Sequence, residues 1–301
     1  MNIGVIDIGS NSIRLIIGEI INKDFNILDD HKEIIRLGDL GEDNKLKDIQ
    51  MLIALTVLKN FKEIINNFNE IDIICVATEA VRKAVNGDYF IKRVKETTGL
   101  NIKILTGEEE AYYEYVSSIK SNSINSGYIM DVGGGSTELI RFEDRRLKES
   151  ISLPYGALNL TLDYSLYDLI GTSSQNEIRM MLYKEFNKYP WLNRGDNSFL
   201  VGMGGSFRAI SKIHSFVLGK TYISENYEVA SKDIKNIYNS IKKMSRQEKM
   251  SLDAISKERG EIIAGGIIII LAALDYLEKK TILISKYGIR EGLIYDYIEH
   301  L

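Results

Sequence analysis

The chain has 301 residues, of which 45% are hydrophobic and 27% charged, a balance that is typical of a folded globular protein and excludes a disordered one. The net charge of −4 argues against a general nucleic-acid binder, so any polyanionic ligand must be held by local cations, backbone dipoles and metal ions. The single cysteine, Cys75, excludes a disulfide framework and a cysteine metal cluster, and the three histidines have no metal-binding spacing.

The first half of the chain predicts an α/β domain, because apolar strand segments alternate with helical segments. The predicted strands cover residues 3–7, 12–20, 25–37, 71–77 and 102–105. The predicted helices cover residues 48–67, a segment from about residue 89, and a segment that begins at Gly107 and Glu108.

The second half repeats the opening pattern of the first. The predicted strands cover residues 128–130, 137–141, 147–153, 199–203 and 282–285, and the predicted helices cover 175–188, 206–216, 232–244, 246–256 and 258–279. Residues 121–126 are rich in Ser and Asn and form the best candidate linker. We therefore predict two domains, residues 1–123 and 124–301.

The most apolar segment covers residues 262–274. A bilayer needs about 20 apolar residues, so this shorter segment predicts a buried helix in which Gly265 and Gly266 allow close contact with a neighbouring element. The N-terminus leads directly into the first strand without a charged leader or a cleavage site. We expect a cytoplasmic protein without a membrane partner.

Two loops have the same sequence pattern, 124 residues apart. Each is an Asp, an apolar residue and a Gly, followed by small or polar residues and then by a returning strand. Glycine allows a positive φ and close approach to a ligand, so successive N–H groups and hydroxyls can converge on an anion. A plain tight hairpin is the alternative, but the shared register of both copies favours a phosphate loop. The candidate phosphate-binding residues are Ser10, Asn11, Ser12, Gly133, Gly134, Gly135 and Ser136.

A third glycine turn, at residues 202–208, lies between a predicted strand and a predicted helix. Free N–H groups at a helix N-terminus bind anions, and we expect Ser206 to cap this helix. Gly204, Gly205, Ser206 and Arg208 are therefore further candidates for substrate binding, with a plain capped turn as the alternative.

Arg82 follows the strand 71–77, at the kind of strand end where α/β sheets bind ligands. Its planar guanidinium can hold two phosphate oxygens at once, and a surface salt bridge is the alternative.

Together these motifs resemble the exopolyphosphatase and guanosine pentaphosphate phosphatase (Ppx/GppA) family of the actin and sugar-kinase superfamily. The stretches that carry the resemblance are residues 7–12, 77–82 with Asn86, 107–111, 131–138, 202–208 and 288–293. The resemblance implies an α/β fold with two related domains of the actin-like ATPase (ribonuclease H-like) type that face a central cleft. It also implies hydrolysis of the terminal phosphate of inorganic polyphosphate or of guanosine pentaphosphate.

The resemblance assigns the catalytic base to Glu110, which directly precedes Ala111. A carboxylate within reach of the attacking water can orient it and accept its proton. The alternative is that the glutamates 108–110 only stabilise the start of a helix, which we prefer for Glu108. Glu109 remains the substitute base.

Asp131 and Glu138 match the metal-associated carboxylates of the family, which implies Mg²⁺ or another divalent cation as the cofactor. Magnesium favours one or two protein carboxylates together with water and substrate phosphate oxygens. Asp7, the duplicated partner of Asp131, either holds a water of that metal or only fixes its own hairpin. Arg14 remains open as a phosphate contact.

The leading hypothesis is a metal-assisted exopolyphosphatase, in which water attacks in line with the terminal phosphoanhydride bond. A guanosine pentaphosphate 5′-phosphatase is the alternative of the same class. An ATP-dependent small-molecule kinase and a non-catalytic nucleotide-binding protein are alternatives of other classes. The oligomeric state is open, with a homodimer among the alternatives, and no specific nucleic acid is expected as a partner.

Overall fold

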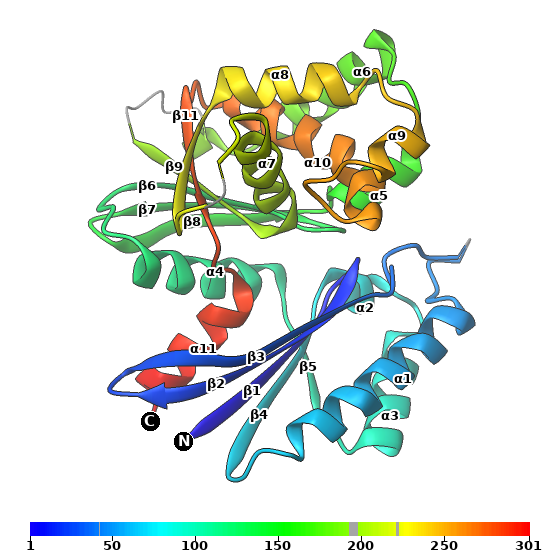
Figure 1. Cartoon of the computed structure of the whole chain (residues 1–301), viewed down its shortest axis with the longest axis vertical. Helices are drawn as coiled ribbons and strands as arrows, with labels where there is room; N and C mark the ends of the chain where they lie inside the picture. The colour runs from blue at the N-terminus through cyan, green and yellow to red at the C-terminus, as the bar shows by residue number, and fades with distance from the viewer. Residues whose placement is uncertain (42, 193–197, 221–222) are drawn as a thin grey trace. The chain divides into compact units, whose positions relative to one another are not determined.

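The computed structural model describes residues 1–41, 43–192, 198–220 and 223–301 (Figure 1). The chain forms two compact units, unit 1 from Met1–Lys120 with Gly288–Leu301, and unit 2 from Ser121–Tyr287. Both ends of the chain lie in unit 1 (Figure 1).

Unit 1 is built on a mixed sheet with the strand order β3-β2-β1-β4-β5. The central strand β1 pairs antiparallel with β2 and parallel with β4. The strands are β1 (Asn2–Ile8), β2 (Ser12–Ile21), β3 (Asp24–Ile34), β4 (Ile71–Ala77) and β5 (Ile102–Ile104). The helices are α1 (Asp48–Ile65), α2 (Glu79–Lys83), α3 (Gly87–Thr98), α4 (Gly107–Ser121) and α11 (Ile289–Glu299).

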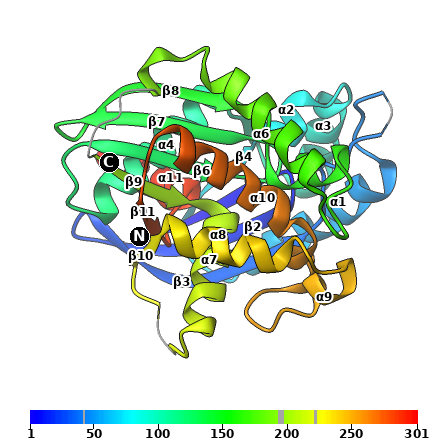
Figure 2. The same cartoon turned by 90° about the horizontal axis from the view of Figure 1, so that it is seen from above.

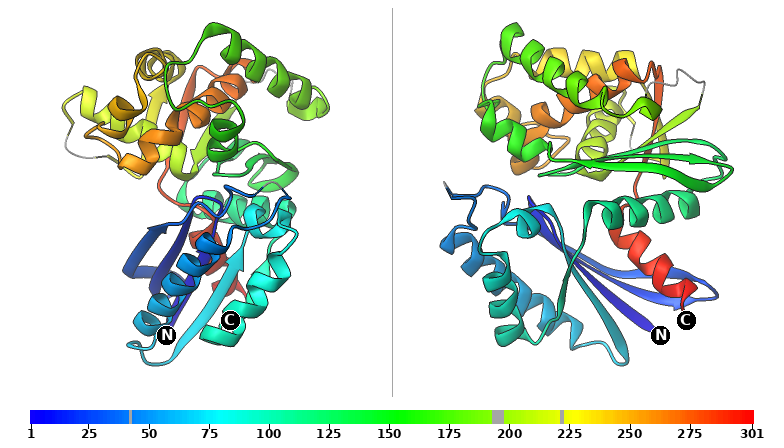
Figure 3. Two further views of the ribbon diagram at one scale, coloured as in Figure 1. Left: turned by 90° about the vertical axis from the view of Figure 1, so that its right-hand side faces the viewer. Right: turned by 180° about the vertical axis from the view of Figure 1, so that it is seen from behind.

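Alternate side chains of β1 build two separate cores, because successive residues of a strand point to opposite faces of the sheet. Ile6 and Ile8 belong to a core that also contains buried residues of α1 and α3. Ile3 and Val5 belong to a second core with Leu293 and other residues of α11. Figure 3 shows α11 on the opposite face of this sheet from α1 and α3.

Unit 2 has the strand order β10-β11-β9-β6-β7-β8. Its strands are β6 (Gly127–Val132), β7 (Thr137–Glu143), β8 (Arg146–Leu153), β9 (Phe199–Met203), β10 (Asn226–Ala230) and β11 (Thr281–Ser285). Without the edge strand β10, the order and directions repeat those of unit 1, with β6 antiparallel to β7 and parallel to β9. Two related α/β domains, as predicted, are thus confirmed.

The helices of unit 2 are α5 (Ala157–Asp163), α6 (Thr172–Phe186), the 3-10 helix η1 (Pro190–Leu192), α7 (Gly204–Val217), α8 (Ser231–Ile241), α9 (Arg246–Met250) and α10 (Lys257–Tyr276). The helices α5 to α9 pack around α10, which supplies many of the residues of the largest core. Figure 2 shows α10 between α6 and α8. Of the described helices, none has both the length and the apolarity that crossing a bilayer requires.

The two glycines of α10 have the close contacts that the sequence predicts. A β-carbon at Gly265 would lie 2.7 Å from the carbonyl oxygen of Ala157 in α5. A β-carbon at Gly266 would lie 2.4 Å from Ser206 Oγ in α7. The two glycines thus allow α5 and α7 to pack closely against the same stretch of α10. The N-termini of α5 and α7 adjoin glycine turns that were predicted to bind phosphate.

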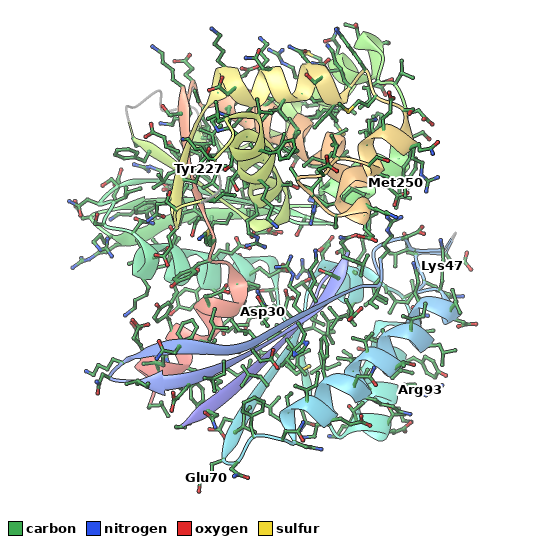
Figure 4. All side chains as sticks on the ribbon, viewed as in Figure 1. Asp30, Lys47, Glu70, Arg93, Tyr227 and Met250 are labelled. Atoms are coloured by element: carbon green, nitrogen blue, oxygen red, sulfur yellow. The ribbon has the colours of Figure 1, made fainter. Side chains whose placement is uncertain are left out.

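The units differ from the predicted division of the chain in the position of α11. Residues 124–301 were predicted to form one domain, but α11 packs on unit 1. Buried Arg290 forms an ion pair of 2.6 Å with Asp30, which Figure 4 labels on β3, and Tyr295 donates a hydrogen bond to Asp24 at 3.0 Å. The boundary between Lys120 and Ser121 falls next to the predicted linker.

Replacing Gly292 of α11 with alanine is expected to destabilise unit 1. A β-carbon there would lie 1.9 Å from the carbonyl oxygen of Tyr113 in α4, so the backbones of the two helices would have to separate. Overpacking of this kind costs about 1–3 kcal/mol, and contact with backbone leaves little room for relief. Urea unfolding would measure the loss, with Gly171→Ala as the control, since a β-carbon at Gly171 meets nothing within 4 Å. Equal stability of the two variants would contradict the close crossing.

Candidate functional site

The two glycine loops have the same geometry. The first glycine loop (residues 9–12) joins β1 to β2, and the second glycine loop (residues 133–136) joins β6 to β7. In each, the first glycine donates its N–H to the carbonyl of the serine three residues later, at 3.0 Å in both Gly9–Ser12 and Gly133–Ser136. The predicted duplicated hairpin is confirmed.

The carbonyl groups of the first glycine loop are held from one side. Ser10 O accepts the N–H of Gly38 at 2.8 Å, and Asn11 O accepts the N–H groups of Ile35 and Arg36 at 3.1 and 3.0 Å. Because a trans peptide is planar, its C=O and the following N–H point in opposite directions. The N–H groups of Asn11 and Ser12, which follow these two carbonyls, therefore point away from the 35–38 segment. In this direction they can donate to an anion.

The Asn11 side chain supports a ligand at this loop. It is 6% exposed, and neither its Oδ1 nor its Nδ2 has a hydrogen-bond partner among the described residues. Leaving a buried polar group unsatisfied costs about 1–3 kcal/mol, so such a group in a folded protein indicates an unseen partner. An amide side chain in a loop of oriented N–H groups suits a phosphate oxygen.

The second glycine loop is held by the start of α5. The carbonyl groups of Gly133, Gly134 and Gly135 accept hydrogen bonds of 2.8 to 3.2 Å from residues 157–159. Gly156 has to be a glycine here, because a β-carbon would lie 2.4 Å from the carbonyl group of Gly134. By the same peptide geometry, the N–H groups that follow these carbonyls point away from α5.

The two candidate metal carboxylates face each other across neighbouring strands. Asp131 of β6 and Glu138 of β7 are directly opposite in the antiparallel ladder, so both side chains are on the same face of the sheet. Both are buried, and Glu138 Oε1 accepts a hydrogen bond of 2.7 Å from Ser152 Oγ. The same register pairs Asp7 with Arg14 in unit 1. The duplicated position is thus a carboxylate in one unit and a guanidinium in the other.

This donor set suits a hard divalent cation. Within the described part of the chain, no group of three or more His, Cys, Asp or Glu side chains is arranged to hold a metal ion. Two adjacent carboxylates match the way in which magnesium binds, with water and phosphate oxygens completing its shell.

Glu110 lies in the first turn of α4 and is 5% exposed. Its Oε1 accepts a hydrogen bond from Arg82 Nη1, and Arg82 Nη2 pairs with Glu79 Oε2 at 2.5 Å. Burial raises the pKa of Glu110 to about 7, helped by the negative charges of Asp7 and Glu79 and opposed by Arg82. A carboxylate with a pKa near neutrality is a suitable general base.

Arg82 thus contacts the candidate base in the structure. It lies in α2, a short helix that the sequence did not predict, and its Nη1 also donates to the carbonyl of Leu105. In this position Arg82 orients the carboxylate of Glu110. These contacts within the protein fix the Arg82 side chain without a phosphate.

Glu109 points to other partners. Its carboxylate pairs with Lys103 at 2.6 Å and accepts the N–H of Thr106 at 2.9 Å. The hydrogen bond with Lys103 lowers the pKa of Glu109. Glu108 is exposed in the same turn. Among the three glutamates, the geometry therefore favours Glu110 as the base.

The third glycine turn meets Asp131, one of the two candidate metal carboxylates, at the start of α7. Gly204 has a φ of +83°, and a β-carbon there would lie 2.0 Å from Asp131 Oδ1. The prediction that Ser206 caps the helix is wrong. The N-cap is Met203, so Ser206 is inside the first turn, and its Oγ donates to the carbonyl of Val132 at 3.4 Å. Arg208 donates to the carbonyl of Lys286 at 3.0 Å.

Arg259 of α10 belongs to the same site and was not singled out from the sequence. Its Nη2 lies 2.1 Å from where a β-carbon of Gly205 would be. Burial and the nearby positive charge of Arg208 lower the pKa of Arg259 to about 10, while Asp131 opposes the shift. These two guanidinium groups at the start of α7 are a candidate anion site. In the sequence, Arg259 is visible only as part of the polar cluster 258–261 that precedes the apolar segment 262–274, which does not indicate a binding role.

Comparison with known proteins places the whole chain beside one family of phosphatases. The model of the Ppx/GppA phosphatase family matches residues 5–301. The chain is 31% identical over 316 residues to a bifunctional 3-dehydroquinate synthase/phosphatase of Fusobacterium nucleatum, covering 98% of this chain but 46% of that protein, so it spans about half of its length. It is 24% identical to exopolyphosphatase 1 of Mycobacterium leprae, over 98% of this chain and 88% of that protein. A crystal structure of the Ppx/GppA family member of Aquifex aeolicus is similar over 100% of this chain and 98% of that one, with a TM-score of 0.82 and 28% identity.

Proposed function

Because the chain belongs to the Ppx/GppA phosphatase family, we propose that it is an exopolyphosphatase that removes the terminal phosphate of inorganic polyphosphate by attack of water. The observation that carries the proposal is Glu110, a buried carboxylate with a pKa of about 7 in the unit that also holds the first glycine loop. A carboxylate of this kind can orient the attacking water and accept its proton.

The donors of both units support a substrate with many phosphates. Unit 1 offers the amides of the first glycine loop and the Asn11 side chain. Unit 2 offers the second glycine loop and the pair Arg208 and Arg259 at the start of α7. Since the net charge is −4, these local donors must supply the attraction that a basic surface would otherwise give.

In the proposed reaction, Glu110 accepts a proton from water as the water oxygen attacks the terminal phosphorus, and the phosphoanhydride bond to the rest of the chain breaks. Arg82 keeps the Glu110 carboxylate in place. Asp131 and Glu138 would hold Mg²⁺, which when bound neutralises charge on the phosphate oxygens. The amides of each glycine loop would bind phosphate oxygens of the substrate.

The rate is expected to rise with pH up to about neutrality. The pKa of Glu110 is raised to about 7, so the carboxylate is protonated, and inactive as a base, below that pH. The acid limb of kcat/KM against pH should therefore have its midpoint near 7 rather than near the usual value for glutamate. Initial rates at saturating magnesium between pH 5 and 9 would measure it. A midpoint near 4.5 would contradict the assigned environment of Glu110.

Phosphate release from inorganic polyphosphate, guanosine pentaphosphate and ATP, assayed side by side, tests the proposed substrate. We expect the highest kcat/KM with polyphosphate. A preference for guanosine pentaphosphate would assign the alternative 5′-phosphatase activity. Transfer of phosphate from ATP to a small molecule, without release from polyphosphate, would overturn hydrolysis altogether.

A further inference from the structure

The hydrogen bonds that hold the second glycine loop come from two kinds of donor. The carbonyl of Gly133 accepts the backbone N–H of Ala157, and the carbonyl of Gly134 accepts the backbone N–H of Leu158. Any residue except proline supplies such a donor. The third carbonyl differs, because the donor to Gly135 O is the Nδ2 of the Asn159 side chain, at 2.8 Å.

Asn159 is itself fixed from two further directions. Its Oδ1 accepts the backbone N–H of Gly156 at 2.6 Å, and its Nδ2 also donates to the carbonyl of Pro154 at 3.0 Å. Both ends of the Asn159 amide are therefore fixed by hydrogen bonds, and its Nδ2 holds the carbonyl of Gly135 toward α5. Because the peptide is planar and trans, the N–H of Ser136 then points to the opposite side.

The first glycine loop achieves the same orientation without a side chain. Asn11 O, which is equivalent to Gly135 O in the duplicated pattern, accepts the backbone N–H groups of Ile35 and Arg36. The corresponding amide of unit 1 is thus oriented by main chain alone. Unit 2 uses one side chain for this purpose, so a single substitution can disturb one loop and leave the other intact.

We propose that Asn159 is a positioning residue that aims the Ser136 amide at a phosphate oxygen of the substrate. This inference rests on the proposed function, which makes the second glycine loop a phosphate site. Asn159 does not touch the substrate in this view. It fixes the direction of a donor, and a preorganised donor is worth far more to the bound phosphate than one that must turn on binding.

The variant Asn159→Asp separates the two roles of the side chain. An aspartate can still accept the N–H of Gly156, which keeps the start of α5, but it places oxygen instead of NH₂ against the carbonyls of Gly135 and Pro154. Asn159→Ser removes the contact to Gly135 without adding a charge. The control is Thr161→Val in the same helix, which deletes a buried hydrogen bond of 2.7 Å from Thr161 Oγ1 to the carbonyl of Ala157 and leaves Gly135 untouched.

Both Asn159 variants are expected to lose kcat/KM by about 10- to 100-fold relative to Thr161→Val. The same comparison is made for binding of inorganic tripolyphosphate with magnesium, in a Glu110→Gln background so that no ligand is hydrolysed, where a weaker affinity of at least about tenfold is expected. Thermal unfolding checks that all variants are folded, and Asn159→Ser takes the place of Asn159→Asp should the latter fail.

Values of kcat/KM and tripolyphosphate affinity within about twofold of those of Thr161→Val would overturn the positioning role, because removal of one preorganised donor costs much more than that. A wild-type protein that releases no phosphate from polyphosphate would sink the proposed function instead. Even without hydrolysis, the comparison of tripolyphosphate affinities tests whether Asn159 positions the Ser136 amide. If the wild type does not bind tripolyphosphate at all, the positioning role of Asn159 is also overturned.

Discussion

The Glu110→Gln variant is expected to lose turnover by a factor on the order of 10² to 10⁴ while it keeps its fold and its binding of polyphosphate. The amide of glutamine has the shape of the carboxylate and can still accept the hydrogen bond of Arg82, but it cannot accept the proton of the attacking water. Steady-state phosphate release gives kcat, and direct binding of polyphosphate gives the affinity. The loss should appear in kcat, since the base acts in the chemical step.

Glu109→Gln is the matched control for this experiment, because Glu109 is the neighbouring residue and was the other candidate base. Its carboxylate is engaged by Lys103 and by the N–H of Thr106, away from the Arg82 network. We expect activity within a few-fold of the wild type. If Glu109→Gln were inactive and Glu110→Gln active, the roles of the two residues would have to be exchanged.

Excess chelator is expected to abolish the activity of the wild-type protein, and Asp131→Ala and Glu138→Ala are expected to need more magnesium for half-maximal activity. Each substitution removes one carboxylate from the facing pair on β6 and β7, and with it part of the charge that binds the ion. Titration of the rate with Mg²⁺ measures the shift. Asp163→Ala, at an exposed carboxylate of the same unit, should titrate like the wild type.

Full activity in excess chelator would refute the metal role. A parallel loss of activity at all magnesium concentrations, with no shift of the midpoint, would show that Asp131 and Glu138 act on the fold or on the substrate rather than on an ion.

Much of the fold could be predicted because its signals are local. Strands 71–77 and 199–203 are apolar runs, and the structure has them at the predicted bounds. The elements without a prediction are the short helices α2, α5 and η1, the edge strand β10 and the terminal helix α11. Short elements carry too few residues for a period to emerge, and the partner of an amphipathic helix is set by tertiary packing rather than by its own sequence.

The site shows the same division. The glycine loops are contiguous in sequence, so their pattern identifies them. Arg259 could not be identified from the sequence in this way, because only the packing of α10 on α7 brings it close to Gly205. The predicted N-cap at Ser206 was wrong because α7 begins two residues earlier, at Gly204. At Gly204 the carboxylate of Asp131 leaves no room for a side chain.

The assignment of α11 to unit 1 has a consequence for biosynthesis. The segment Met1–Lys120 is synthesised before unit 2, but helix α11, which completes unit 1, is synthesised after all of unit 2. Until then the sheet face that bears Ile3, Val5 and Ile16 lacks the cover of Leu293 and Ile294. Unit 2, which is continuous, can complete its core first. An exposed apolar face on a waiting intermediate is prone to aggregation, so the nascent chain is most vulnerable, and most in need of a chaperone, between the emergence of β5 and that of α11.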